Sequence, residues 1–293
     1  MARYWLTPEL AKALAAAMHG GQAELNCSLD LGLSTQHVQL SPTAVTLAEG
    51  AALSLEQLRE MASAKRGVFI FDDGRLAPVQ ISAEYFYKLI PTDEAPTVEI
   101  SGIQMHRTTG TAPFLNAMNS AKTVVRKGAA VLDTCGGLGY TAVAAARHGA
   151  ASVVSLDVDP NVREIARQNP WSAEYFSSPV IELVDADAAE FVAAQPDGSF
   201  DCVVHDPPRF SRAGHLYGEE FYHGLARVLR PRGRLFHYTG DPFSKSRGKS
   251  FVQGVLRRLQ SAGFEPRRAG HLQGIVARLG TERPPATSCE CPW

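Results

Sequence analysis

Carboxylates follow the predicted strands in the middle of the chain, at positions where parallel strands of one sheet would end. Asp133 closes the apolar run 129–132, and a loop with three glycines at 136–139 leads from it into a helix-forming run that begins at Tyr140. Glycine lets a backbone bend sharply and approach a ligand closely, and free N–H groups at a helix start favour polar or anionic atoms. Asp157 closes the next apolar run, roughly 20 residues after the loop, where a carboxylate is placed to bind ribose hydroxyls.

The glycine spacing differs from the dinucleotide fingerprint G-x-G-x-x-G, because it reads G-G-x-G and an acid precedes it. The loop, the two acids and Asp-Pro-Pro at 206–208 together resemble the class I S-adenosylmethionine-dependent methyltransferases. This resemblance implies a Rossmann-like, doubly wound α/β sheet with S-adenosyl-L-methionine as cofactor. It assigns Asp133 to the methionyl ammonium, Asp157 to the ribose hydroxyls and Asp187 to the adenine amino group. The fallbacks for the last two roles are Asp159 and Asp185.

A carboxylate at one strand end is often only a helix N-cap, but three in the expected order favour a binding site. In many class I methyltransferases the segment ahead of the first strand folds over the methionine end of the cofactor, so the polar segment 100–110 is expected there, with a plain linker as the alternative. The residues expected to bind the cofactor are Asp133, Cys135, Gly137, Gly139, Tyr140, Asp157, Asp187 and His106.

The fourth predicted strand ends in Asp206-Pro207-Pro208, where two prolines stop the strand and stiffen the turn. Such a turn fixes the Asp206 side chain and the Pro207 carbonyl as a rigid pair of acceptors for both hydrogens of an NH₂ group. Asp-Pro-Pro followed by an aromatic residue is the signature of amino-group methyltransferases acting on adenine or cytosine. Here Arg209 stands in the aromatic position and Phe210 follows, so Arg209 would stack through its guanidinium plane or contact phosphate.

Longer runs carry a closer resemblance. The stretches 205–211, 216–222, 227–238 and 247–250 resemble a mainly archaeal methyltransferase family, often labelled spermidine-synthase-like, over about residues 100–280. At least one member of that family is associated with N4-methylation of cytidine in small-subunit ribosomal RNA. The residues expected at the target amino group are Asp206, Pro207, Pro208, Arg209 and Phe210, with His205, His237 and Tyr238 beside them.

Alternating strands and helices must position these residues. The expected strands are 129–133, 151–157, 180–185, 200–206 and 233–239, with an antiparallel strand at 273–279, and the expected helices are 140–148, 160–169, 187–194, 219–229 and 250–262. This βαβ alternation predicts a parallel, doubly wound sheet. We divide the chain into an N-terminal α+β domain for substrate positioning (1–104), a methyltransferase domain (105–280) and a disordered tail (281–293).

The N-terminal segment contains local signals of its own. Helical patterns begin at Pro8 and at Ser54, where Gln57 three residues later completes a capping box. Asp72-Asp73-Gly74 predicts a hairpin turn after a strand at 67–71. The aromatic run 85–87 is expected in the core rather than as a nucleic-acid stacking surface.

Composition places the chain among ordinary proteins of the cytoplasm. Its 293 residues are 45% hydrophobic and 20% charged, no apolar run approaches the ~20 residues that span a bilayer, and the first residues contain no signal-peptide core. Five scattered cysteines predict neither a disulfide framework nor, at Cys289 and Cys291, a metal site, because two ligands without a partner pair bind metal poorly.

Charge is distributed unevenly along the chain. Residues 205–283 contain fifteen Lys/Arg and six Asp/Glu, whereas the whole chain has a net charge of −1. This asymmetry indicates either a basic face for an acidic partner such as RNA, or charges spread around the surface. The candidate phosphate contacts are Lys245, Arg247 and Lys249.

The sequence therefore predicts a methyltransferase that methylates an exocyclic amine of a nucleobase, with cytidine N4 in RNA first among the candidates. It offers no cysteine placed for the C5-pyrimidine route, because Cys202 lies within a strand upstream of Asp206. The alternatives are an aminopropyltransferase or small-amine methyltransferase, and an assembly factor that binds the cofactor and RNA. An aminopropyltransferase would need further acids near Asp206, where this chain has Arg209 and Arg212.

Overall fold

The computed structural model describes residues 3–240 and 246–281, the side chains of 246–250 excepted. The chain forms two compact units. The first contains residues up to 115 together with 159–177, and the second contains 116–158 together with the residues from 178 onward. Each unit has its own sheets and its own hydrophobic core.

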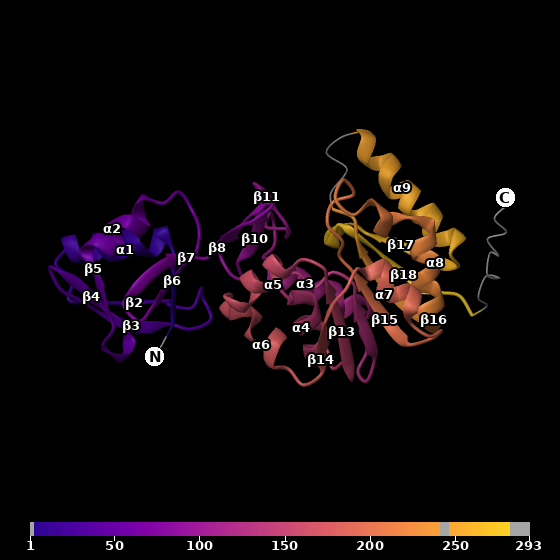
Figure 1. The fold of residues 1–293 in the computed structure, drawn as a ribbon, viewed down its shortest axis with the longest axis horizontal. Helices are drawn as coiled ribbons and strands as arrows, with labels where there is room; N and C mark the ends of the chain where they lie inside the picture. Colours follow the sequence, from indigo (N-terminus) through magenta and orange to yellow (C-terminus); the bar gives the residue numbers. More distant parts are fainter. Residues whose placement is uncertain (1–2, 241–245, 282–293) are drawn as a thin grey trace. The chain divides into compact units, whose positions relative to one another are not determined.

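The second unit is built on one seven-stranded sheet (Figure 1). In spatial order its strands are β14 (Ile181–Asp185), β13 (Ser152–Asp157), β12 (Ala130–Asp133), β15 (Phe200–His205), β16 (Leu229–Tyr238), β18 (Gly274–Leu279) and β17 (Phe264–Ala269). The pairs from β14 to β16 are parallel, whereas β18 is antiparallel to both of its neighbours. The predicted parallel, doubly wound sheet and its antiparallel closing strand are confirmed.

The strand order reverses at β12, because the chain adds β13 and β14 on one side of it and β15 and β16 on the other. In open α/β sheets ligands bind outside the carboxyl ends of the strands at such a reversal. The register aligns Asp133 with Val204 on one side and with Ser155 on the other. The ends of β12, β13 and β15 therefore meet at one edge of the sheet.

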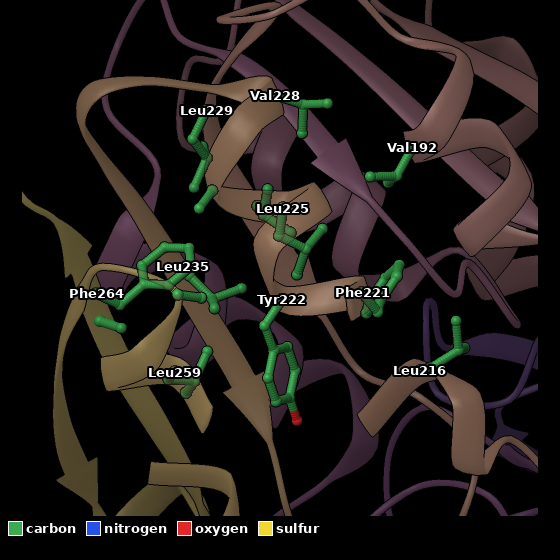
Figure 2. Close-up of a cluster of buried hydrophobic side chains, with 14 of the residues drawn as sticks. Val192, Leu216, Phe221, Tyr222, Leu225, Val228, Leu229, Leu235, Leu259 and Phe264 are labelled. Carbon is green, nitrogen blue, oxygen red and sulfur yellow. The ribbon is translucent and has the colours of Figure 1, made fainter. Parts of the chain in front are cut away.

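Five longer helices belong mainly to this unit. They are α3 (Pro113–Val124), α4 (Tyr140–Arg147), α7 (Ala188–Ala194), α8 (Glu219–Val228) and α9 (Ser246–Ser261), and a short 3-10 turn, η3, covers Gly214–Tyr217. Apolar side chains of α7, α8, α9 and η3 form a buried cluster with the sheet. Figure 2 shows Leu225, Leu235 and Phe264 in this cluster, and the Tyr222 ring directs its hydroxyl away from Leu225.

The first unit contains three small antiparallel sheets. Their strands are β1 (Tyr4–Leu6), β6 (Phe69–Asp72) and β7 (Arg75–Pro78); β2 (Glu24–Cys27), β3 (Gln36–Leu40), β4 (Ala44–Thr46) and β5 (Ala52–Ser54); and β8 (Gln80–Ser82), β9 (Phe86–Ile90), β10 (Thr97–Ile100) and β11 (Ile103–Gln104). The helices are α1 (Pro8–His19), α2 (Leu55–Ser63), α5 (Pro160–Arg167) and α6 (Ala173–Ser177).

Local sequence signals in this unit are confirmed. Ser54 and Gln57 form the predicted capping box at the start of α2. Asp73 and Gly74 join β6 to β7 with φ of 49° and 74°, the left-handed conformation that a two-residue hairpin turn requires. The segment 83–89, whose pattern suits a short helix or a strand, contains most of the strand β9.

One expectation did not hold at the level of packing. Tyr85 and Phe86 are 40% and 42% exposed, so of the aromatic run only Tyr87 is buried as predicted. Moreover, residues 159–177 pack with the N-terminal unit, although they follow β13 directly in sequence. The proposed boundary at residue 104 stays a prediction, and the proposed tail lies outside the described residues apart from Thr281.

Candidate active site

The glycine loop after β12 has the backbone geometry that its sequence predicts. Gly137 and Gly139 adopt φ of 55° and 81°, where a Cβ would be strained, and Gly139 is the N-cap of α4. The Gly136 N–H donates to the Leu156 carbonyl at 2.6 Å, and the Gly137 N–H donates to Asp157 Oδ2 at 2.7 Å. The loop after β12 is thus held directly to the end of β13.

Asp133 is fully buried at the end of β12 and is only partly satisfied. Its Oδ2 accepts hydrogen bonds from Thr141 at 2.9 Å and from Ser155 at 2.8 Å. The Cys135 N–H lies close enough to favour the ionised form, but among the described residues nothing donates to Oδ1 with hydrogen-bond geometry. A buried carboxylate oxygen without a donor is costly, so this position suits a cationic ligand group.

Burial raises the pKa of Asp133 to about 6, with a further contribution from the charge of Asp157, against the opposing effect of the two hydroxyl groups. A positive charge beside the carboxylate would favour its ionised form and return the pKa to its ordinary range. Burial and the same acids raise the pKa of Cys135 well above its usual value, so this loop thiol is uncharged and acts as a small packed residue.

The two candidates for the ribose role differ in what they already do. Asp157 stands at the end of β13, where its carboxylate binds the loop N–H of Gly137. Asp159 instead caps α5, accepting from the Asn161 N–H at 2.9 Å, and also accepts from the Tyr87 hydroxyl at 2.7 Å. Because the Asp159 carboxylate is engaged in these hydrogen bonds within the first unit, Asp157 remains the candidate for the ribose hydroxyls.

Asp187 is engaged as the N-cap of α7. It accepts from the Ala189 N–H at 2.8 Å and pairs with His215 at 3.0 Å. Burial alone would raise the pKa of Asp187, but the Ala189 N–H and the His215 ring lower it below its usual value. The adenine role of Asp187 stays a prediction, as does that of Asp185 at the end of β14.

The turn after β15 carries the second carboxylate of the site. Asp206 lies one residue beyond the strand, and no hydrogen bond to its side chain is formed within residues 3–240 and the described side chains of 251–281. Burial, followed by the negative charge of Asp133, raises the pKa of Asp206 to about 7. The two carboxylates therefore interact at the same sheet edge, and each has acceptor capacity that the fold leaves unused.

The residues after Asp206 face different surroundings. Pro207 is buried, Pro208 and Arg209 are exposed, and Phe210 is 56% exposed. The Phe210 ring contacts those of Tyr217 and Phe251 edge-on, with centroids 5.6 Å and 6.0 Å away. Phe210 thus joins an aromatic group despite standing one position later than the family signature expects.

The two histidines predicted beside the acceptor are fully buried. His205 shares hydrogen bonds with Thr134 and with the Leu216 carbonyl, and burial lowers its pKa to about 3. His237 bonds to the Tyr222 hydroxyl at 2.9 Å, and burial lowers its pKa well below the usual value. Both rings are neutral, so they can support neighbouring groups but do not supply positive charge to a ligand.

The described structure does not test several of the predicted site residues. His106 belongs to the first unit, where it bonds to Thr97 Oγ1 at 2.9 Å, and burial lowers its pKa to about 4. Its role toward the cofactor stays a prediction. Lys245, Cys289 and Cys291, and the side chains of Arg247 and Lys249, lie outside the described residues.

Sequence reasoning missed the hydroxyl groups that organise the acids. Thr141 and Ser155 bind Asp133 across eight and 22 residues of sequence, and Tyr217 reaches the proline turn. Only Thr141 had a sequence signal, since it is the second residue of a helix whose start was predicted. The described residues form no group of three or more His, Cys, Asp or Glu that could hold a metal ion. No helix within that same part of the chain is long and apolar enough to cross a bilayer.

The parallel sheet, its reversal at β12, the glycine loop and the acids define a class I methyltransferase. Residues 131–233 match the family model described as a methyltransferase domain, and the protein is an S-adenosylmethionine-dependent methyltransferase. It is 45% identical over 227 residues to "Uncharacterized protein MJ1233" of Methanocaldococcus jannaschii, a match covering 77% of this chain and 78% of that protein. The chain belongs to the family of that archaeal protein.

Other relatives match shorter stretches. Polyamine aminopropyltransferase 2 of Streptomyces coelicolor is 32% identical over 136 residues, which cover 44% of this chain and 24% of that enzyme. Putrescine N-methyltransferase 4 of Nicotiana tabacum is 30% identical over 106 residues, 35% of this chain and 28% of that enzyme. These matches span less than a third of each relative's own length.

A solved structure of spermidine synthase, in complex with the transition-state analogue AdoDATO, has a TM-score of 0.57 to this chain at 21% identity. The similarity covers 69% of this chain and 73% of that one, and it shows the fold alone.

The site fits S-adenosylmethionine on the chemistry of its own residues. The donor-free Oδ1 of buried Asp133 suits the methionyl ammonium, and the Asp157 carboxylate at the next strand end suits the ribose hydroxyls. The left-handed glycines leave open space where a Cβ would lie at Gly137, so the loop backbone can approach a ligand.

Proposed function

We propose that this methyltransferase methylates an exocyclic amino nitrogen of a nucleobase, with cytidine N4 in ribosomal RNA as the first candidate. The observation that carries the proposal is the Asp206-Pro207-Pro208 turn at the edge that also holds Asp133. The Asp206 carboxylate accepts no hydrogen bond from the described residues, so it has full capacity to accept one from an amine.

Bound S-adenosylmethionine supplies an electrophilic methyl group on a sulfonium. Asp206 and the Pro207 carbonyl would accept the two N–H groups of the acceptor and thereby direct its lone pair. These hydrogen bonds increase the electron density on a nitrogen whose lone pair is otherwise delocalised into the base. Transfer would form the N–C bond as the S–CH₃ bond of the sulfonium breaks and leaves its electron pair on the sulfur. The methylated nitrogen would then lose one N–H proton, which Asp206 can take. Catalysis then comes mainly from positioning two bound reactants.

The surroundings of the turn support an anionic, planar acceptor. Arg209 and Arg212 are exposed beside it, where they can contact phosphate. Phe210 is also exposed, and bases in single-stranded RNA are recognised by stacking on such rings. The RNA partner and the phosphate role of Lys245, Arg247 and Lys249 belong to this proposal.

A second candidate function is methyl or aminopropyl transfer to an aliphatic polyamine, and the names of the partial relatives favour it. Polyamines are cations, so a site for them needs acids at both ends of the acceptor. Asp206 would supply one such end, whereas Arg209 and Arg212 would repel the other. A third candidate, an RNA assembly factor that binds the cofactor, requires that function persist without methyl transfer.

The test is nucleoside mass spectrometry of total RNA from cells with and without the gene. Loss of one methylated cytidine on deletion, restored by the wild-type gene and not by an Asp206→Ala gene, is the expected result. An unchanged RNA profile contradicts the proposal. Purified enzyme with labelled cofactor would then be offered putrescine and spermidine, with the decarboxylated cofactor as a parallel arm.

A further inference from the structure

The acceptor turn cannot hold itself in place through its own backbone donors. Pro207 and Pro208 have no N–H, so the segment between Asp206 and Arg209 can be fixed only through its carbonyl groups or by side-chain packing. A 1 Å displacement of a reacting group can reduce a rate by about 10²-fold. Whatever fixes these carbonyls therefore bears on the chemistry at Asp206.

Tyr217 supplies the donor on one side of the turn. Its hydroxyl donates to the Pro208 carbonyl at 2.9 Å and lies 3.5 Å from the Pro207 carbonyl. The Tyr217 side chain is buried, and its ring packs against those of Phe210 and Phe251 with centroids 5.6 Å and 5.5 Å away. The ring is therefore held by packing, and the hydroxyl is directed at the turn.

His205 holds the other side, immediately before Asp206. Its ring shares hydrogen bonds with the Leu216 carbonyl at 3.1 Å and with Thr134 Oγ1 at 2.7 Å. One neutral tautomer satisfies both contacts: Nε2–H donates to the carbonyl, and Nδ1 accepts from the hydroxyl. Leu216 precedes Tyr217, and Thr134 follows Asp133. The two hydrogen bonds of His205 therefore connect the cofactor loop to the residue next to Tyr217.

We propose that Thr134, His205 and Tyr217 form a turn clamp, in which His205 and Tyr217 are positioning residues that hold Asp206 at a fixed place relative to Asp133. The clamp acts through the turn and touches neither reactant. It deepens the function proposed above and rests on it, because a fixed acceptor turn matters only if Asp206 orients the acceptor amine.

The first test removes one oxygen atom. Tyr217→Phe keeps the packed ring and loses the hydrogen bond to Pro208, so kcat should fall about tenfold, with the cofactor Kd unchanged within about twofold. The matched control is Tyr222→Phe, which removes a hydroxyl of an equally buried ring that bonds to His237 at 2.9 Å. The control should lower Tm at least as much but leave kcat within about twofold of the wild type.

A second pair tests the link to the cofactor loop. Thr134→Val removes the hydroxyl that donates a hydrogen bond to His205 Nδ1, and Thr134→Ser keeps this hydroxyl. We expect the serine variant to retain wild-type kcat and the valine variant to lose about tenfold. Equal kcat in the two variants would overturn this part of the clamp, and the pair decides it even if Tyr217→Phe does not fold.

An acceptor-independent readout separates the clamp from the proposed function. The Arg212 and Ala213 N–H groups donate to the Arg209 carbonyl at 2.8 Å and 3.3 Å, so their exchange with solvent reports order after the turn. Exchange there should be about tenfold faster in Tyr217→Phe than in Tyr222→Phe.

Transfer is measured from tritiated S-adenosylmethionine to RNA from cells lacking the gene. If the wild type transfers nothing to it, the proposed function fails, while faster exchange still supports the clamp. Unchanged exchange overturns the clamp.

Discussion

Asp133 and Asp206 lie at the carboxyl ends of two neighbouring parallel strands, but their surroundings differ. Asp133 is fully buried and receives two hydroxyl groups on one oxygen. Asp206 receives no hydrogen bond from the described residues, and its turn is held instead through backbone carbonyls. The comparison indicates that the proposed cofactor half of the site is preassembled by side chains, whereas the carboxylate of the proposed acceptor half is left open to accept hydrogen bonds.

The largest effect is expected at the open carboxylate. Asp206→Ala should reduce kcat by about 10³-fold, because it removes both the acceptor for the amine N–H and the group that can take its proton. The cofactor Kd, measured by isothermal titration calorimetry, should change by less than about threefold, since Asp133 and Asp157 remain.

Asp197→Ala is the matched control, because Asp197 pairs with Arg227 on the exposed surface at 3.0 Å and should leave kcat unchanged. Retention of transfer within tenfold of the wild type in Asp206→Ala would contradict the role of this carboxylate. Full restoration of an RNA-dependent phenotype by the inactive variant would favour the assembly-factor alternative.

The preassembled carboxylate should respond in the opposite way. Asp133→Asn removes the charge beside the proposed methionyl ammonium, so the cofactor Kd should rise about 10- to 100-fold, with a smaller change in kcat at saturating cofactor. Ser155→Ala removes only one of the two donors to Asp133 and should weaken binding by no more than about threefold. Equal Kd values for Asp133→Asn and the wild type would remove this residue from the cofactor site.

The raised pKa values of the two acids predict a dependence of stability on pH. Asp206 has a folded pKa of about 7 against an ordinary 3.8, so its contribution is fully present below about pH 4 and is lost as pH rises toward 7. The variant Asp206→Asn has no carboxyl group at this position, so it does not lose this stability as pH rises. In the ligand-free protein it should exceed the wild type in unfolding free energy at pH 8 by on the order of 4 kcal/mol, with little difference at pH 4.

Asp30→Asn is the control of opposite sign. Burial alone would raise the pKa of Asp30, but hydrogen bonds from Ser34 and Ser28 lower it, so its contribution is present above the ordinary pKa and is lost only as pH falls through the lowered value. Its difference from the wild type should therefore be constant between pH 5 and 8. Thermal melts of the three proteins across this range check the comparison, and parallel curves for Asp206→Asn and the wild type would contradict it.

The sequence predicted the features of this site that depend on local signals. A strand followed by an acid, a run of glycines or a pair of prolines can be recognised within ten residues of sequence. Asp133, Asp157 and Asp206 do lie at or just after the ends of their strands. The parallel, doubly wound character of the sheet followed from the alternation of strands and helices.

The partners of these acids could not be predicted in the same way. Ser155 reaches Asp133 across 22 residues, and His215 reaches Asp187 across 28, so both contacts are products of tertiary packing. The prediction that Tyr85 and Phe86 are buried was wrong for a related reason. Aromatic composition indicates burial on average, but the face of a sheet that becomes covered depends on the elements packed against it. Residues 159–177 were likewise placed by contacts distant in sequence.

The smallest predicted effect separates two acids only two residues apart. Asp157→Ala should raise the cofactor Kd about tenfold, because it removes the ribose acceptor and the loop contact to Gly137. Asp159→Ala should lower the free energy of unfolding by about 1 kcal/mol through loss of the α5 N-cap, and leave the cofactor Kd within about twofold. Denaturant unfolding and calorimetry on the same two variants give both values. If Asp159→Ala weakens cofactor binding more than Asp157→Ala does, Asp157 is not the ribose ligand, and the N-cap residue Asp159 has that role instead.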